Sequence, residues 1–160
     1  MLTATHIAST GGENPGRGYN HLQDDIYDWY SSAQKDWLST PLGTFVGPVY
    51  LKFTFAEAAK VSDIWVWQQN EYTTSHREVK TMDLEYRTDS VGPWEMAVSG
   101  YHVPPSAATH PNPRHTFPVD ASLPPAKQWR LALQSVHNPH LNDGYVGFMG
   151  IKFFSAVLCP

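Results

Sequence analysis

The chain has 160 residues, with 11 lysines and arginines against 15 aspartates and glutamates, and a formal net charge of −4 at pH 7. This length suits one domain spanning residues 1–160, and the acidic balance disfavours a nucleic-acid-binding protein, which normally carries a basic excess. The hydrophobic content of 41% argues against disorder, and the single cysteine, Cys159, excludes an intrachain disulfide.

Residues 20–41 fit no single strand, and we expect a loop with a short helical turn there. Three aspartates, Asp24, Asp25 and Asp28, lie close together in this segment. Carboxylates at this density either face water or supply oxygen ligands to Ca²⁺. A third interpretation, a pair of catalytic carboxylates as in glycosidases, would need the two groups to flank a sugar at a defined separation.

Seven later runs of alternating apolar and polar residues predict β-strands. In the clearest run, Met82, Leu84 and Tyr86 alternate with polar residues, so one face packs on a core and the other meets water. Pro118 indicates a strand end or a sheet edge. The predicted strands are residues 50–55, 61–67, 81–87, 94–98, 114–119, 129–133 and 149–153. Connections rich in Gly, Pro, Asn and Asp separate them, which favours an all-β sandwich or barrel.

Residues 67–78 form the densest polar and aromatic cluster of the sequence, between two predicted strands. Planar amides, the Arg77 guanidinium and the Tyr72 ring suit sugar recognition, because such groups bind hydroxyls and pack on the C–H face of a pyranose. The alternative interpretation is structural. Gln69 and Asn70 could then cap backbone groups, and Arg77 could pair with a neighbouring carboxylate, Glu78 or Asp83.

His137 and His140 are spaced three apart, but Pro139 between them prevents a shared helical face, which disfavours a transition-metal site. Imidazoles beside aromatic residues are also suited to hydrogen bonds with sugars. The chain has no Gly-x-Ser-x-Gly, His-Glu-x-x-His or phosphate-loop motif, so we do not expect an enzyme.

Several segments, in order along nearly the whole chain, resemble the discoidin, or coagulation factor 5/8 C-type, domain. They are residues 20–24, 36–39, 65–70, 77–86, 88–89, 94, 129–131 and 145–153. The resemblance is to bacterial versions in particular, the family 32 carbohydrate-binding modules. It implies an antiparallel jelly-roll β-sandwich of about eight strands, galactose-binding-domain-like, that binds sugar with loops at one end and has no catalytic activity.

The resemblance also implies attachment to a polysaccharide-degrading enzyme and, in many members, a structural Ca²⁺ near the loops. This chain departs from the pattern at several positions. Glu78 replaces a Gly, Gln69 replaces an aromatic residue and Asp25 replaces a Gly. Gly150 stands where the closing strand usually has a Glu that often binds Ca²⁺. A calcium site would therefore depend on the three aspartates and on carbonyl groups.

We therefore expect a carbohydrate-binding module with a polysaccharide or oligosaccharide ligand, of galactose type on the family resemblance. An aromatic side chain would pack on a sugar ring, and loop side chains would bind its hydroxyls. The candidate ligand-binding residues are Trp29, Tyr30, Asn70, Tyr72, His76, Arg77, His137, Asn138 and His140, and the candidate metal ligands are Asp24, Asp25 and Asp28.

The main alternative is a discoidin-type module that binds protein or phospholipid. The aromatic residues Trp29, Tyr30 and Trp37 are flanked by aspartates, which disfavours an anionic membrane surface. The first residues lack a signal-peptide pattern. As a module of a longer protein, the chain is expected to be extracellular or secreted. We expect a monomer.

Overall fold

A computed structural model describes residues 1–13, 17–23, 37–40, 42, 45–69, 77–106, 112–142 and 144–155. Within these ranges the chain consists mainly of strands. The elements are β1 (Ala4–Ser9), η1 (Tyr19–Leu22), β2 (Trp37–Leu38), β3 (Val49–Ala59), β4 (Val61–Gln68), β5 (Val79–Arg87), β6 (Glu95–His102), β7 (Arg114–Pro118), β8 (Ala126–Val136) and β9 (Gly147–Ser155). In the part of the chain that the structure describes, no helix is long and apolar enough to cross a membrane; η1 has four residues.

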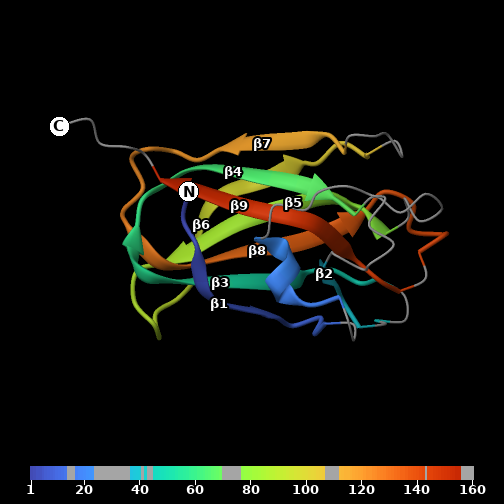
Figure 1. The fold of residues 1–160 in the computed structure, drawn as a ribbon, viewed down its shortest axis with the longest axis horizontal. Coiled ribbons are helices and arrows are strands. Elements are labelled where there is room, and N and C mark those ends of the chain that lie inside the picture. Colours follow the sequence, from blue (N-terminus) through green and yellow to red (C-terminus); the bar gives the residue numbers. More distant parts are fainter. Residues whose placement is uncertain are drawn as a thin grey trace.

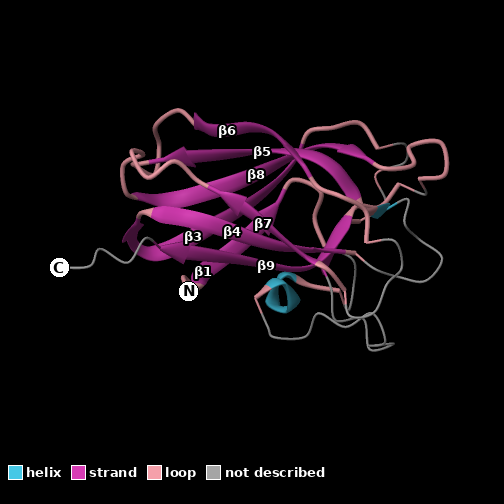
Figure 2. Ribbon diagram, turned by 90° about the horizontal axis from the view of Figure 1, so that it is seen from above, coloured by secondary structure: helices cyan, strands magenta, loops and turns pink. Residues whose placement is uncertain are grey.

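The strands form two antiparallel sheets that lie face to face (Figures 1 and 2). The five-stranded sheet has the order β1-β3-β8-β5-β6, and the four-stranded sheet has the order β2-β9-β4-β7. Strands that are distant in the sequence are therefore neighbours, as in a jelly roll. The all-β sandwich predicted from the alternating runs is confirmed.

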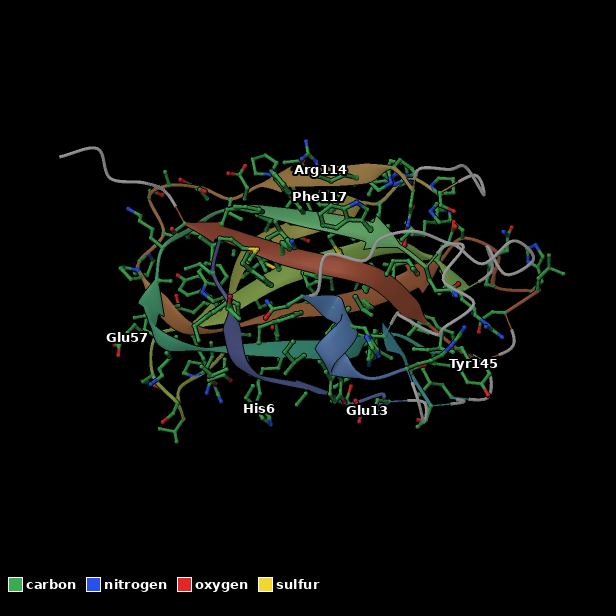
Figure 3. The ribbon with its side chains drawn as sticks, in the orientation of Figure 1. His6, Glu13, Glu57, Arg114, Phe117 and Tyr145 are labelled. Atoms are coloured by element: carbon green, nitrogen blue, oxygen red, sulfur yellow. The ribbon has the colours of Figure 1, made fainter. Side chains whose placement is uncertain are left out.

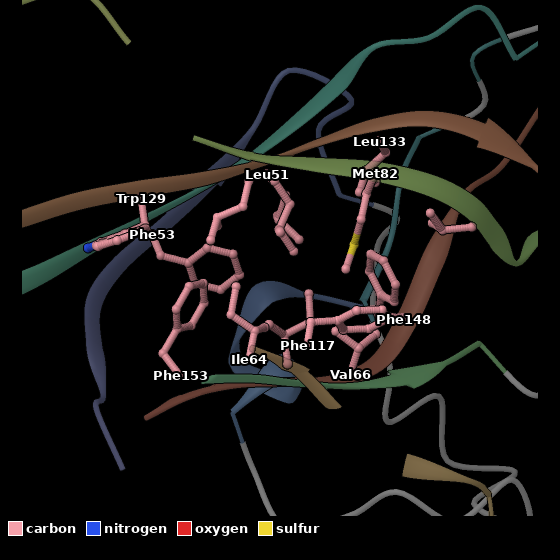
Figure 4. Packing of buried hydrophobic residues seen from close by; sticks show 14 of the residues in the cluster. Leu51, Phe53, Ile64, Val66, Met82, Phe117, Trp129, Leu133, Phe148 and Phe153 are labelled. Carbon is pink, nitrogen blue, oxygen red and sulfur yellow. The ribbon is translucent and has the colours of Figure 1, made fainter. Parts of the chain in front are cut away.

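The core lies between the sheets, where the alternating apolar residues of both sheets meet (Figure 4). Leu51 and Phe53 of β3 and Leu133 of β8 are fully buried, as are Ile64 of β4 and Phe153 of β9. The rings of Phe53 and Phe153 join the two layers, with centroids 4.8 Å apart. Burial of apolar surface between two such faces is the main stabilising contribution in a sandwich.

All seven predicted strands are present, and Pro118 ends β7, which is an edge strand as its proline indicates. The expected helical turn corresponds to η1. Two strands were not predicted. β1 (Ala4–Ser9) lacks a clear alternation of large apolar and polar residues, and β2, which has two residues, lies in the segment expected to be a loop.

The predicted alternation of Met149, Ile151 and Phe153 is wrong at Met149. Trp67 pairs with Gly150 and the next residue, Gln68, pairs with Phe148, so a bulge leaves Met149 without a partner in this ladder. Phe148, rather than Met149, belongs to the core cluster. A bulge shifts the alternation by one residue, and a simple period-two pattern does not show it.

Candidate functional site

Three connections meet at one end of the sandwich, where β4, β6 and β8 end and β5, β7 and β9 begin. We call this the loop end (right side of Figure 1). Strand pairing places them together, because Gln68 pairs with Phe148, Val79 with Val136 and Thr81 with His102. An isolated parallel bridge between Glu78 and Gly147 links the two sheets there.

The structure describes four of the predicted site residues, Arg77, His137, Asn138 and His140, and all four lie in the connections of the loop end. The other predicted residues lie outside the described residues. They are Trp29, Tyr30, Asn70, Tyr72 and His76 for the ligand, and Asp24, Asp25 and Asp28 for calcium.

Arg77 and Tyr145 are brought together at the loop end, although they come from different connections. Arg77 precedes β5 and Tyr145 precedes β9, and the Arg77 Cζ lies 5.0 Å from the centre of the Tyr145 ring. This is a cation–π distance, so the guanidinium lies beside the aromatic ring. Tyr145 is half-buried and lies at the loop end (Figure 3). Tyr145 was not among the predicted ligand-binding residues.

Two buried amide side chains, Gln68 and Asn112, bind backbone groups at the loop end. The Gln68 side chain donates to the Val79 carbonyl and accepts from the Val79 N–H, and so bridges the two ends of the β4–β5 connection. Asn112 donates to the Gln68 carbonyl at 2.9 Å. These buried amide contacts join the β4–β5 and β6–β7 connections.

Glu78 is a fully buried carboxyl group at the loop end, at a position where the family resemblance expects glycine. Its oxygens accept hydrogen bonds from the Ser106 hydroxyl and the Ser106 backbone N–H. Burial raises the pKa of Glu78, and the hydrogen bonds from Ser106 partly oppose that rise. The glutamate that replaces the expected glycine at position 78 thus joins the β4–β5 connection to the β6–β7 connection.

His137 is half-buried, and its ring is held by the protein itself. Nε2 lies 2.7 Å from the Val103 carbonyl oxygen, and the ring meets that of His102 edge to face. The carbonyl fixes Nε2 as the protonated nitrogen, which leaves Nδ1 to contact a ligand. Burial lowers the pKa of His137, and the hydrogen bond to the Val103 carbonyl partly opposes that shift.

The residues after His137 form a tight turn that exposes polar and apolar side chains together. The Leu141 N–H donates to the Asn138 carbonyl at 3.0 Å, and His140 and Leu141 face solvent. The Asn142 side chain closes the turn by donating to the Tyr145 carbonyl and accepting from the Gly144 N–H. Asn142 therefore positions the segment that carries the Tyr145 ring.

Metal ligands are not grouped in the part of the chain that the structure describes. No three or more His, Cys, Asp or Glu side chains lie together there in an arrangement that could hold a metal ion. Gly150, buried in β9 opposite Trp67, offers no side-chain oxygen. The three aspartates proposed for calcium lie outside this part.

This chain resembles known proteins in its structure but not detectably in its sequence. No protein-family model and no curated protein matches its sequence. The family 32 carbohydrate-binding module of NanJ from C. perfringens, solved in complex with galactose, matches with a TM-score of 0.65 and 13% identity, over 92% of this chain and 91% of that one.

Two further structures agree. The family 32 carbohydrate-binding module of EndoD from Streptococcus pneumoniae matches with a TM-score of 0.63 and 17% identity, over 96% of this chain and 95% of that one. An F5/8 type C domain from Bacteroides fragilis matches with a TM-score of 0.64 and 11% identity, over 96% of each chain. The chain therefore has the discoidin-like, galactose-binding-like β-sandwich fold of family 32 carbohydrate-binding modules, as its sequence motifs predict.

Proposed function

We propose that this protein is a non-catalytic carbohydrate-binding module that recognises a glycan at the loop end. The observation that carries the proposal is the Arg77 guanidinium held beside the Tyr145 ring, at the end of a sandwich whose solved relatives are carbohydrate-binding modules. One relative is described in complex with galactose and another bound to GalNAc. A galactose-type ligand is therefore our proposal for this chain.

The chemistry of the pair suits a sugar. A guanidinium donates two parallel hydrogen bonds and can bind neighbouring hydroxyls, and an aromatic face packs on the apolar C–H face of a pyranose. Tyr145 supplies such a ring in addition to the predicted Trp29, Tyr30 and Tyr72. A shallow site buries little area, so we expect a Kd of about 10⁻³ to 10⁻⁵ M, or roughly −4 to −7 kcal/mol.

The proposal also covers the location of the module, its attachment to an enzyme, its oligomeric state and its metal. We infer that the chain is an extracellular module attached to a polysaccharide-degrading enzyme, that it is a monomer, and that Asp24, Asp25 and Asp28 hold a structural Ca²⁺. Carboxylate oxygens are the ligands that Ca²⁺ prefers, which supports the assignment of these three residues.

A glycan array followed by calorimetric titration of the best ligand tests the proposal. Arg77→Ala should weaken the binding by about tenfold or more, because a hydrogen-bonded charged group contributes roughly 1.5–3 kcal/mol. Lys127→Ala is the control, since Lys127 is exposed near the start of β8, at the end of the sandwich opposite the loop end. Unchanged affinity in Arg77→Ala would contradict the assignment of that residue.

Two further results would overturn the function itself. A folded domain that binds no glycan on the array would contradict the module assignment and favour a protein ligand. Release of reducing sugar from mixed polysaccharides by the purified chain would contradict the absence of catalysis.

A further inference from the structure

A second candidate site lies on the outer face of the five-stranded sheet, away from the loop end. A cavity of about 280 Å³ opens there. Its walls include the cations Lys52, Arg87 and Arg130 and the aromatic rings of Tyr50 and Trp94. Arg87 ends β5 and Trp94 precedes β6, so part of the cavity wall belongs to the end of the sandwich opposite the loop end.

Strand register explains why cations gather in this cavity. Arg130 of β8 pairs with Lys52 of β3 on one side and with Glu85 of β5 on the other. The flanking residues Leu51 and Leu131 point into the core, so the side chains of the paired row point outward. Three strands that are far apart in the sequence thus place a row of charged side chains on one surface.

Aromatic rings hold the two guanidinium groups in place. The Arg130 Cζ lies 3.9 Å from the Tyr50 ring centre and 4.3 Å from the Trp94 ring centre. The Arg87 Cζ lies 4.7 Å from the Trp94 ring centre, and its Nε–H donates to the Gln128 side chain. Groups held in this way lose little conformational entropy when they bind a ligand.

The charges of the cavity do not balance. Glu85 accepts hydrogen bonds from Arg130 and neutralises it. Among the described residues, neither Lys52 nor Arg87 has a carboxylate partner, and both are half-buried beside Arg130. Two uncompensated positive charges in one cavity repel each other, whereas the whole chain has a net charge of −4. Stacking on Trp94 and the hydrogen bond to Gln128 position Arg87, but neither contact compensates its positive charge or that of Lys52.

We propose that this cavity binds one carboxylate-bearing sugar ring, a uronate. The ligand carboxylate would lie between Lys52 and Arg87, where it would compensate both charges. The Tyr50 and Trp94 rings would contact the apolar face of the sugar, and the hydroxyls of Ser9 and Thr10 at the cavity wall could bind its hydroxyl groups. The volume admits a single ring rather than a chain of sugars.

This second site does not depend on the function proposed for the loop end. Titration of the ¹⁵N-labelled protein with galacturonate, followed by the assigned indole N–H signal of Trp94, tests it directly. We expect saturable shifts with galacturonate, weaker binding as NaCl rises from about 50 to about 500 mM, and at least tenfold weaker binding of galactose at this signal. Equal affinity for galactose, or for inorganic phosphate, would overturn the uronate assignment.

Paired variants separate the two sites. Lys52→Gln with Arg87→Gln should weaken galacturonate binding by about tenfold or more, and it leaves the Arg130–Glu85 pair intact. Lys127→Gln, an exposed position on β8, and Arg77→Ala at the loop end should leave that binding unchanged. Loss of galacturonate binding in Arg77→Ala, or its persistence in the folded double variant, would contradict the proposed location.

Discussion

At the scale of single residues, buried polar side chains join the connections of the loop end. Glu78 is fully buried, and its carboxyl group accepts hydrogen bonds from Ser106, which joins the β4–β5 and β6–β7 connections. A buried carboxylate costs free energy to desolvate, and this burial raises the pKa of Glu78. The folded state therefore binds this proton more tightly than the unfolded state.

The raised pKa predicts how stability changes with pH. The contribution of Glu78 to the free energy of unfolding is most favourable below its ordinary pKa, and it is lost as pH rises through the folded pKa. Glu78→Gln cannot ionise, so its free energy of unfolding should rise relative to that of the wild type between about pH 4 and about pH 7. Urea unfolding at both pH values measures this difference.

The comparison at two pH values cancels any constant cost of the new amide group. Glu57→Gln is the control, because Glu57 is exposed on β3 at the opposite end of the sandwich (Figure 3). A Glu78→Gln effect that is the same at both pH values would show that Glu78 does not titrate differently in the two states.

The sequence indicated the candidate residues at the loop end only in part. Arg77 was predicted from its residue type and lies at the loop end, but its aromatic neighbour Tyr145 was not predicted. The two residues belong to different connections and meet because Glu78 pairs with Gly147. Gly147 is required there, since a Cβ atom at this position would lie 2.5 Å from the Trp37 carbonyl oxygen of β2.

At the scale of elements, β8 is the central strand of the larger sheet, with β3 on one side and β5 on the other. Leu133 of β8 is fully buried and pairs with Val49 and Met82 (Figure 4). β6, in contrast, is an edge strand whose Met96 side chain is 52% exposed. Position in the sheet, rather than apolar character alone, therefore decides how much each strand residue stabilises the fold.

This difference predicts two outcomes. Leu133→Ala should lower the free energy of unfolding by about 2–5 kcal/mol, because it removes buried methyl groups and leaves a cavity. Met96→Ala, a substitution of similar size on β6, should change it by no more than about 0.5 kcal/mol. Chemical unfolding of both variants measures the two effects, and similar losses in both would contradict the assigned strand order.

Strand prediction succeeded where one face of the strand is buried and the other is exposed to solvent. In β5, for example, Met82, Leu84 and Tyr86 face the core. It failed where this condition is absent. β1 is an edge strand of mostly small residues, and the bulge in β9 places Met149 out of step with Ile151. In both cases the pairing with a neighbouring strand, which is not written in the local pattern, decides the structure.

At the scale of the whole molecule, the sandwich separates two surfaces of different chemistry. The loop end holds Arg77 beside Tyr145, and the outer face of the five-stranded sheet holds the cationic cavity around Arg130. Two sites on a rigid scaffold can bind different ligands without sharing residues. The loop-end proposal and the uronate proposal can therefore fail separately.

Calcium removal tests the remaining proposal at this scale. If Asp24, Asp25 and Asp28 hold Ca²⁺ only in the folded protein, a hundredfold excess of free Ca²⁺ over its Kd stabilises the fold by about 2.7 kcal/mol. The melting temperature should then fall when a chelator is added. A variant with all three aspartates changed to alanine should melt at the same temperature with and without calcium. A wild-type melting temperature that is unchanged by the chelator would contradict the proposed calcium site.

The sequence by itself determined the fold class and the polarity of the connections, because both follow from local alternation and from turn-forming residues. The tertiary structure alone decided which side chains share a surface. Tyr50, Arg87, Trp94 and Arg130 come from four separate segments and form one cavity only through the strand order β3-β8-β5-β6. Hydrogen-bonded register between strands distant in the chain sets such neighbours, and no pattern along a single strand encodes them.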